Sequence, residues 1–268
     1  MKTPLTYYGG KQQMAATILR LIPEHKMYVE PFIGGAAIYF AKEPSKGEVI
    51  NDTNGELVNF YEVVKRDFPA LQREIEVSLY SREKHREAEV VYNNPGMFDR
   101  VKRAWAVWFI ANVSYGAKMD GAFSYDREGK FPGNLAKKRD AFTAECAARL
   151  QNTQIECCDA LRIIRSRDTP DSFFYCDPPY VGAYQGHYDG YGQGDFDNLL
   201  AELEQLQGKF LLSSYRNPKL KELAEKHGWE TIEIKMSLSM SRLPDGGGKR
   251  QKVEVLTANY PILERLGK

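Results

Sequence analysis

The segment from Ser172 to Gly182, SFFYCDPPYVG, places a carboxylate, two prolines and a tyrosine directly after an apolar run. Pro178 and Pro179 remove two backbone N–H donors, so strand pairing cannot continue beyond Asp177. The Asp177 carboxylate and the Pro178 carbonyl are then neighbouring acceptors, which suit the two N–H donors of an exocyclic amine. Tyr180 adds a flat face for stacking on the ring that carries the amine. The segment predicts a site for a planar amino-heterocycle, and a simple strand-ending turn is the alternative.

Two other apolar runs end in residues that suit a nucleoside. In YVEPFIGGAA, Glu30 and Phe32 lead into Gly34 and Gly35, where the backbone can approach a ligand closely at a helix start. Asp52 follows the next run, about twenty residues later, where an acid can accept hydrogen bonds from ribose hydroxyls. A tight turn at the glycines and a helix N-cap at Asp52 are the structural alternatives. The two runs together favour an adenosine-type ligand.

Several other kinds of site are excluded by spacing. The stretch YYGGKQQM is not a phosphate-binding P-loop, because Leu5 stands where the first glycine belongs and Gln12 follows Lys11. The glycine turn does not follow the dinucleotide pattern G-x-G-x-x-G. The four cysteines and four histidines are scattered without the spacing of a metal site. We therefore expect no metal.

Composition indicates a globular protein with local basic patches. The 268 residues are 43% hydrophobic and carry a net charge of +1. Residues 100–150 hold ten Lys/Arg against five Asp/Glu, whereas residues 54–99 hold six against nine. A second basic cluster lies in SRLPDGGGKRQK, and such patches suit a nucleic-acid groove or, alternatively, solvated loops. Without a membrane-length apolar run or a signal peptide, we expect a cytoplasmic protein.

Alternating strands and helices must position these residues. Apolar runs bounded by turn residues predict strands at 27–32, 48–51, 153–157, 172–176, 209–214, 229–236 and 252–260. Helical patterns lie at 10–22, 36–43, 159–167, 195–207 and 217–227. This alternation predicts an α/β fold with a parallel sheet that is covered on both faces.

One region interrupts the alternation. Residues 54–152 are helical in pattern almost throughout, including a final helix over 136–152. A glycine- and aromatic-rich stretch at 114–134 predicts a hairpin or loop within this region. We interpret 54–152 as an inserted, mostly helical subdomain whose loop lies in the positively charged segment.

Taken together, these stretches resemble the Dam-type family of DNA adenine-N6 methyltransferases, the D12 class with a DPPY motif. The resemblance covers nearly the whole chain and is carried by YYGGKQQM, YVEPFIGGAA, IND, CCDALRII, DPPY, FLLSSY and KVEVLTANY. It implies a Rossmann-like, S-adenosylmethionine-dependent methyltransferase sheet formed by residues 1–53 and 153–268. Residues 54–152 would then be the target-recognition subdomain.

The resemblance also implies a role for each matching residue. S-adenosylmethionine would be the methyl donor, without a metal, and an adenine flipped out of duplex DNA would be the acceptor. The residues implied to lie at the cofactor are Tyr8, Lys11, Glu30, Phe32, Gly34, Gly35, Asp52 and Asp159, with Tyr8 and Lys11 beside either the cofactor or the DNA. The residues implied to hold the target base are Asp177, Pro178, Pro179 and Tyr180.

The family resemblance does not predict which DNA sequence the protein recognises. The stretch SYGAKMDGAFSYDREGKFPG departs from the Asn-Gly-rich hairpin of family members that recognise GATC. The candidates for DNA contacts are Lys118, Tyr125, Arg127, Lys130, Arg242, Lys249 and Arg250. We expect a bacterial or phage-encoded, nucleoid-associated enzyme, and a restriction endonuclease partner is not specified by any residue. The alternatives are an amino methyltransferase for RNA or protein, and an inactive DNA-binding regulator.

Overall fold

A single sheet forms the centre of the protein. The computed structural model describes residues 1–181, 190–242 and 249–267, and it describes only the backbone of residues 237–242 and 249–251. Within this part of the chain, seven strands run in the order β3-β2-β1-β4-β5-β7-β6. The strands are β1 Met27–Glu30, β2 Gly47–Asn51, β3 Thr153–Glu156, β4 Ser172–Cys176, β5 Lys209–Ser214, β6 Glu230–Arg242 and β7 Lys249–Ala258.

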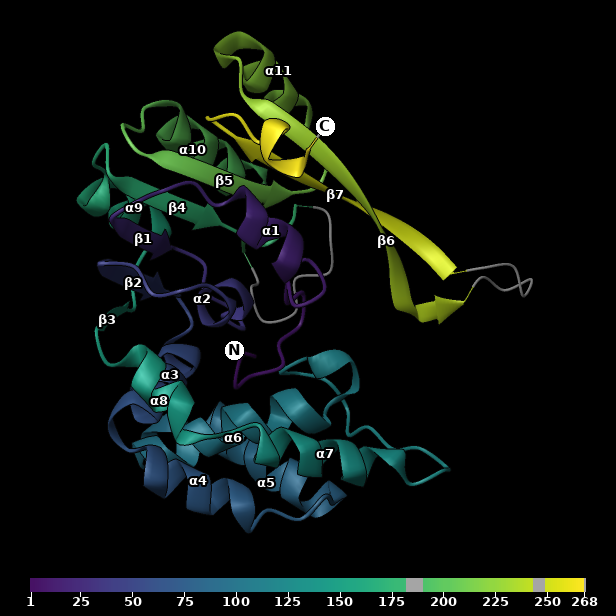
Figure 1. Cartoon of the computed structure of the whole chain (residues 1–268). Coiled ribbons are helices and arrows are strands. Elements are labelled where there is room, and N and C mark those ends of the chain that lie inside the picture. The colour runs from purple at the N-terminus through teal and green to yellow at the C-terminus, as the bar shows by residue number, and fades with distance from the viewer. Residues whose placement is uncertain (182–189, 243–248, 268) are drawn as a thin grey trace.

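The sheet is mixed, which corrects the prediction of a wholly parallel sheet. Strands β3, β2, β1, β4 and β5 are parallel neighbours. Strand β7 pairs antiparallel with both β5 and β6. Because only residues 243–248 separate β6 from β7, the connection is too short for the crossover that parallel pairing needs. The Rossmann-like α/β class is confirmed, with an antiparallel edge that extends away from the body of the protein (Figure 1).

Two apolar cores cover the faces of the sheet because successive strand side chains point to opposite sides. On β1, Tyr28 belongs to one core and Val29 to the other. On β4, Phe173 and Phe174 alternate in the same way. The first core includes side chains of α1 Ala15–Leu21, α2 Ala37–Ala41 and α3 Gly55–Arg66. The second includes side chains of α9 Ala160–Arg167, α10 Gln193–Glu204 and α11 Pro218–His227.

The remaining helices gather with α3 at one end of the molecule (Figure 1). They are α4 Phe68–Glu76, α5 Arg82–Asn93, α6 Arg100–Val113, α7 Lys130–Asp140 and α8 Ala144–Leu150. Helix α6 is central, since Trp105, Trp108 and Phe109 are fully or almost fully buried. Their core is continuous with the α1–α3 face of the sheet. None of the helices in the described part of the chain is long and apolar enough to cross a membrane.

Two boundaries in this region differ from the prediction. Helix α7 begins at Lys130, inside the expected loop, because the Asp126 carboxylate accepts the backbone amides of Lys130 and Phe131. The helix expected over 136–152 is divided into α7 and α8. Between them Phe142 turns into the core and stacks on Phe68, with ring centroids 4.9 Å apart. The expected turn region remains at Tyr115–Ala117, a 3₁₀ turn flanked by an antiparallel bridge between Ser114 and Phe123.

Candidate active site

A large cavity lies at the carboxyl ends of β1 and β4. These strands are parallel neighbours, and the chain leaves them toward opposite faces of the sheet, with α2 after β1 and α10 after β4. Such a point of reversal is where open α/β sheets bind ligands. The cavity has a volume of about 1820 Å³ and is lined by residues of both strand ends and of the α3–α8 region. Because pockets for a drug-sized ligand have volumes of roughly 300–1,000 Å³, the cavity has room for more than one small molecule.

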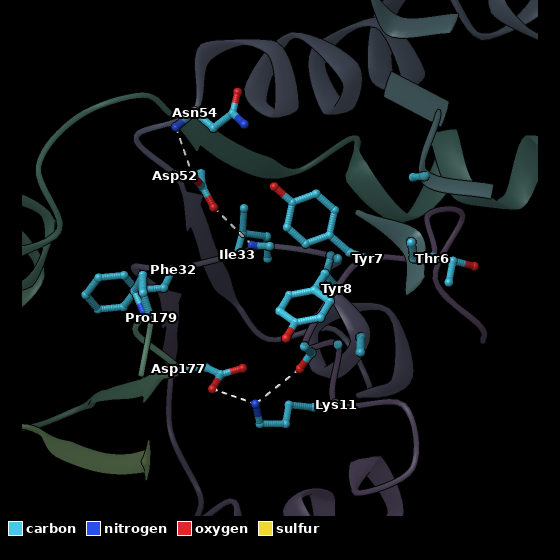
Figure 2. Close-up of a pocket in the computed structure, with 18 of the residues that line it drawn as sticks. Thr6, Tyr7, Tyr8, Lys11, Phe32, Ile33, Asp52, Asn54, Asp177 and Pro179 are labelled. Carbon is cyan, nitrogen blue, oxygen red and sulfur yellow. Dashed lines mark hydrogen bonds and ion pairs between the residues drawn. The ribbon is translucent and has the colours of Figure 1, made fainter. Parts of the chain in front are cut away.

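Asp177 projects its carboxylate into this cavity (Figure 2). The side chain is 19% exposed, and its Oδ1 lies 2.8 Å from Lys11 Nζ and 3.2 Å from the Tyr180 hydroxyl. Among the described residues, no hydrogen bond reaches Oδ2. Burial raises the pKa of Asp177 above its usual value, and the Lys11 charge opposes that shift. The carboxylate is therefore anchored through one oxygen, with the other facing no protein donor.

Lys11 reaches Asp177 from a tight turn near the N-terminus. Gly9 has a φ of +75°, and the Gly10 amide donates to the Tyr7 carbonyl at 3.0 Å. The Lys11 ammonium also donates to the Gly9 carbonyl at 3.3 Å and lies 4.8 Å from the centre of the Tyr180 ring. Lys11 was assigned to the cofactor or the DNA from sequence, and its observed partner in the protein is the Asp177 carboxylate. The glycines therefore bring a buried cation to the DPPY segment.

The glycine turn after β1 is bonded to the end of β2. Gly34 has a φ of +45°, and its amide donates to Asp52 Oδ2 at 3.1 Å. Asp52 Oδ1 accepts the Asn54 amide at 3.0 Å, and Asn54 is the N-cap of α3 (Figure 2). A Cβ on Gly35 would lie 2.8 Å from the Tyr7 Cβ, so a side chain there would collide with the N-terminal segment. The second glycine thus lets two segments that line the cavity pack together.

Glu30 is a buried acid at the end of β1. Its side chain is 2% exposed and accepts a short hydrogen bond from the Tyr28 hydroxyl. Burial raises the pKa of Glu30 to about 8, although Tyr28 and Lys42 act in the opposite direction. Glu30 is therefore largely protonated at neutral pH in the protein alone. A cation that entered the cavity beside it would favour the ionised form.

The other residues assigned to the cofactor also line the cavity. Phe32 contacts Tyr191 edge to face, with ring centroids 6.3 Å apart. Asp159 caps α9, since its Oδ1 accepts the Arg162 amide at 3.2 Å. Tyr8 is 38% exposed. The structure brings all eight of these predicted residues to one cavity. Asn54, and not Asp52, is the N-cap of α3, and Asp52 instead accepts the Asn54 and Gly34 amides. The capping contact of Asp159 was not predicted from the sequence.

Tyr180 directs its hydroxyl into a polar cluster that includes the fully buried Glu254. The hydroxyl lies 2.6 Å from Glu254 Oε2 and 2.7 Å from Ser213 Oγ. Its ring meets Tyr215 edge to face, with centroids 4.5 Å apart. Glu254, Ser213 and Tyr215 were not predicted from the sequence. The available signal was polar residues inside the apolar runs FLLSSY and KVEVLTANY.

Of the predicted DNA contacts whose side chains the structure describes, Lys118 lines the cavity, whereas Tyr125, Arg127 and Lys130 do not. Lys118 Nζ is 5.4 Å from the centre of the Tyr8 ring, so these side chains meet across the cavity. Tyr125 is 67% exposed, and the Arg82 guanidinium lies 4.8 Å from its ring centre. Arg127 and Lys130 are exposed, and Lys130 forms an ion pair with Glu128. The side chains of Arg242, Lys249 and Arg250 lie outside the described part of the structure.

The lining suits an adenosine-bearing amino acid better than a metal. An acid at the end of β2 and a glycine turn at the end of β1 face one cavity, where Glu30 could balance an ammonium group. Phe32 and Tyr191 offer apolar surface for a purine. Within residues 1–181, 190–242 and 249–267, no three His, Cys, Asp or Glu side chains are grouped to hold a metal ion.

Comparison with known proteins agrees with this geometry. Residues 7–238 match the family model described as D12 class N6 adenine-specific DNA methyltransferase. The Type II methyltransferase M.MjaIII of Methanocaldococcus jannaschii is 27% identical over 97% of this chain and 99% of that protein. The DNA adenine methylase of Escherichia coli K12 is 25% identical over 96% of this chain and 94% of that protein.

A third relative is much longer than this chain. The DNA N-6-adenine-methyltransferase of Escherichia phage P1 is 25% identical over 90% of this chain, which spans only 33% of the phage protein. Among solved structures, an rRNA methylase from Streptococcus thermophilus aligns over 91% of this chain and 94% of that chain, with 8% identity and a TM-score of 0.37. A score that low carries no argument about this protein.

Proposed function

The chain belongs to the D12 class of N6 adenine-specific DNA methyltransferases, and on this premise we propose how its own residues carry out the reaction. The established class defines the transfer of a methyl group to N6 of adenine in DNA. The observation that carries the proposal is the state of Asp177, whose Oδ1 is held by Lys11 and Tyr180 while Oδ2 faces the cavity. We assign Oδ2 to the amino group of the target adenine.

The cofactor is assigned to the side of the cavity formed by the glycine turn. Bound there, S-adenosylmethionine supplies an electrophilic methyl group on a sulfonium sulfur. Gly34 and Gly35 allow close backbone approach, Glu30 balances the ammonium group, and the Asp52 carboxylate accepts from the ribose. Completing the cofactor site are Asp159 at the adenine and Phe32, Tyr8 and Lys11 along the lining.

The target base is assigned to the DPPY segment. The amino nitrogen of adenine is a poor nucleophile because its lone pair is delocalised into the ring. Hydrogen bonds from N6 to Asp177 and to the Pro178 carbonyl favour a more tetrahedral nitrogen, and Pro179 keeps that carbonyl out of strand pairing. The Tyr180 ring supports the base, which offsets part of the few kcal/mol that removing it from the duplex costs. Positioning and electrostatics then provide most of the rate enhancement.

DNA contacts are assigned to two parts of the chain. In this division, residues 1–53 and 153–268 form the catalytic domain, and 54–152 form the inserted target-recognition subdomain. Lys118, Tyr125, Arg127 and Lys130 contact the duplex from the subdomain, mostly at phosphates. Arg242, Lys249 and Arg250 contact it from the β6–β7 edge.

The substrate class can be tested directly. Labelled S-adenosylmethionine is incubated with duplex DNA, RNA and protein, and the modified product is identified. We expect label on N6 of adenine in duplex DNA. Label on RNA or protein would favour the amino-methyltransferase alternative, and no transfer with intact DNA binding would favour an inactive regulator. The ionised pair of Asp177 and Lys11 opposes the regulator, because DNA binding alone requires no such pair in a cofactor cavity.

The Asp177→Ala variant tests the assignment of the acceptor residue. Removing the carboxylate deletes the group that orients N6, so methyl transfer should fall by at least about 100-fold, while cofactor affinity should stay within a few-fold. Single-turnover transfer and calorimetric cofactor binding measure the two quantities. Full transfer by the variant would refute the mechanism.

A further inference from the structure

An ion pair between Lys252 and the buried Glu254 lies at the Tyr180 hydroxyl. Glu254 on β7 is fully buried, and its Oε1 accepts a hydrogen bond from Lys252 Nζ at 2.5 Å. The two residues are two positions apart on one strand, so their side chains lie on the same face. A buried carboxylate is costly unless its charge is paired and its oxygens accept hydrogen bonds. Lys252 provides the charge and Tyr180 provides the second hydrogen bond, at 2.6 Å to Oε2.

The Tyr180 hydroxyl has one proton and two carboxylates within reach. Glu254 Oε2 is at 2.6 Å and Asp177 Oδ1 at 3.2 Å, while Ser213 Oγ at 2.7 Å can donate to the phenol oxygen. Of the two hydrogen bonds to carboxylates, the one to Glu254 is shorter and therefore stronger. The proton therefore lies mainly toward Glu254. The ionised Glu254 thereby keeps the tyrosine hydroxyl from acting as a full donor to Asp177.

We propose that Glu254, charge-balanced by Lys252, is a positioning residue for methyl transfer, which fixes the Tyr180 ring and keeps the hydrogen bond from its hydroxyl to Asp177 Oδ1 weak. The inference rests on the proposed function, because it concerns the residues assigned there to the target base. With the hydroxyl engaged by Glu254, Asp177 keeps its acceptor strength for the amino group of adenine. Without the Glu254 charge, the hydroxyl donates fully to Asp177 Oδ1, which weakens the carboxylate as an acceptor for N6 at Oδ2.

The Glu254→Gln variant tests this role. The amide keeps nearly the same shape but loses the charge that attracts the hydroxyl, so kcat should fall on the order of tenfold, as expected for losing a charged hydrogen bond. Cofactor affinity should not change. The matched control is Glu233→Gln, an exposed carboxylate on β6 that pairs with Arg216, and its kcat should equal that of the unmodified protein.

A double-mutant cycle separates positioning from a general structural effect. If Glu254 acts through the Tyr180 hydroxyl, Glu254→Gln should cause no further loss of kcat in a Tyr180→Phe background. Equal losses in both backgrounds would overturn the proposal, as would an unchanged kcat in Glu254→Gln. If Glu254→Gln does not fold, Glu254→Asp keeps the charge beside Lys252 but shortens the reach to Tyr180. The kcat of Glu254→Asp should also fall, and an unchanged kcat would overturn the proposal.

A pH profile provides a readout that a purely structural role would not move. Charged or titratable groups surround Asp177 on every side. Lys11 comes from the N-terminal turn, Glu30 from β1 and Tyr175 from β4. Tyr180 comes from the same segment as Asp177, and Lys252 and Glu254 come from β7. The Glu254 charge raises the pKa of Asp177. In Glu254→Gln the acidic limb of kcat/KM should therefore move to lower pH. An unmoved limb would contradict the proposal.

The same experiments distinguish failure of this inference from failure of the proposed function. An Asp177→Asn variant is measured in parallel. If Asp177→Asn transfers methyl groups normally, the proposed function fails whatever Glu254→Gln does. If Asp177→Asn is inactive and Glu254→Gln is normal, only the role of Glu254 fails.

Discussion

At the scale of single residues, the central feature is a carboxylate whose burial and charge partner oppose each other. Burial raises the pKa of Asp177, whereas the Lys11 ammonium, 2.8 Å from Oδ1, lowers it. A carboxylate must be ionised to accept an N–H bond from an amine with full strength. Lys11 is therefore expected to keep Asp177 functional at neutral pH in a site that would otherwise favour the protonated acid.

Replacing Lys11 tests whether its charge opposes the effect of burial on the pKa of Asp177. In Lys11→Met the pKa of Asp177 should rise further, because burial is no longer opposed by a neighbouring cation. Activity needs the ionised acid and disappears as pH falls through that pKa, so the acidic limb of kcat/KM should move to higher pH. The matched control is Lys26→Met, which removes an exposed lysine paired with Asp171. If the acidic limb of kcat/KM lies at the same pH in Lys11→Met and in Lys26→Met, Lys11 does not keep Asp177 ionised.

Glu30 allows a second prediction at this scale. Its pKa of about 8 in the protein alone means that the carboxyl is mostly protonated at pH 7. If the cofactor ammonium binds beside it, the ionised form becomes favoured and the proton is released. Calorimetric titration of S-adenosylmethionine at pH 7, in buffers of different ionisation enthalpy, should report up to about one proton released. The release should disappear in Glu30→Gln.

Residue types predicted which residues line the cavity better than they predicted the contacts between them. Asp177, Glu30, Asp52 and the glycines were found because each follows an apolar run, and parallel strand ends meet at one edge. The pairing of Lys11 with Asp177 could not be predicted, since it joins positions far apart in the chain through a turn. Glu254 was missed because a single acid within an apolar strand does not reveal its partners.

At the scale of elements, a buried ionic cluster joins the sheet to the helical region. Glu48 on β2 accepts from Lys42 at 2.6 Å and from Arg149 of α8 at 2.8 Å, and all three side chains are nearly inaccessible. Burial alone would raise the pKa of Glu48, but the hydrogen bonds from Arg149 and Lys42 outweigh it and lower the pKa. The stabilisation is present above the usual pKa of glutamate and is lost as pH falls through the depressed value.

Breaking this cluster should destabilise the fold. Glu48→Ala leaves two buried cations without their acid, so the free energy of unfolding should fall by about 3–5 kcal/mol. Glu43→Ala, on the neighbouring exposed turn, is the control and should change it by less than about 0.5 kcal/mol. Denaturant unfolding at pH 7 measures both. Similar small losses would show that β2 and α8 are not joined through Glu48.

The elements themselves were predicted with unequal success, for physical reasons. Strand β4 and most helices of the α/β alternation match because an apolar run or a 3.6-residue period marks them directly. The strand expected at 252–260 is present as β7, but its antiparallel direction was not predicted, because an apolar strand looks the same in either direction. The break between α7 and α8 was missed because Phe142 fits a helical period, although it turns into a tertiary contact with Phe68.

At the scale of the whole molecule, the near-zero net charge conceals an uneven distribution. Residues 100–150 hold ten Lys/Arg against five Asp/Glu. Part of that excess is used internally, as Arg149 and Arg103 are paired with Glu48 and Glu56. Arg127 and Lys130 are exposed, Lys130 pairs with Glu128, and the adjacent Phe131 lines the cavity. We propose that phosphates of a bound duplex lie at these two residues.

DNA binding by this surface should depend on salt. Replacing Arg127 and Lys130 together by alanine should weaken binding to all DNA sequences alike. The slope of log affinity against log salt should decrease by about one for each phosphate that the protein no longer neutralises. Lys221→Ala, on α11 at the opposite end of the molecule, should leave affinity and slope unchanged (Figure 1). Equal salt slopes in all three proteins would remove this surface from the interface.

The most direct test of the central claim is a structure of the protein with the cofactor that lacks its methyl group and with a duplex that carries the target site. That site is first identified by sequencing DNA that the protein has methylated. We predict that the target adenine leaves the stack and that its N6 lies within about 3 Å of Asp177 Oδ2 and the Pro178 carbonyl. An adenine that stays in the helix, or whose amino group contacts neither acceptor, would contradict the account.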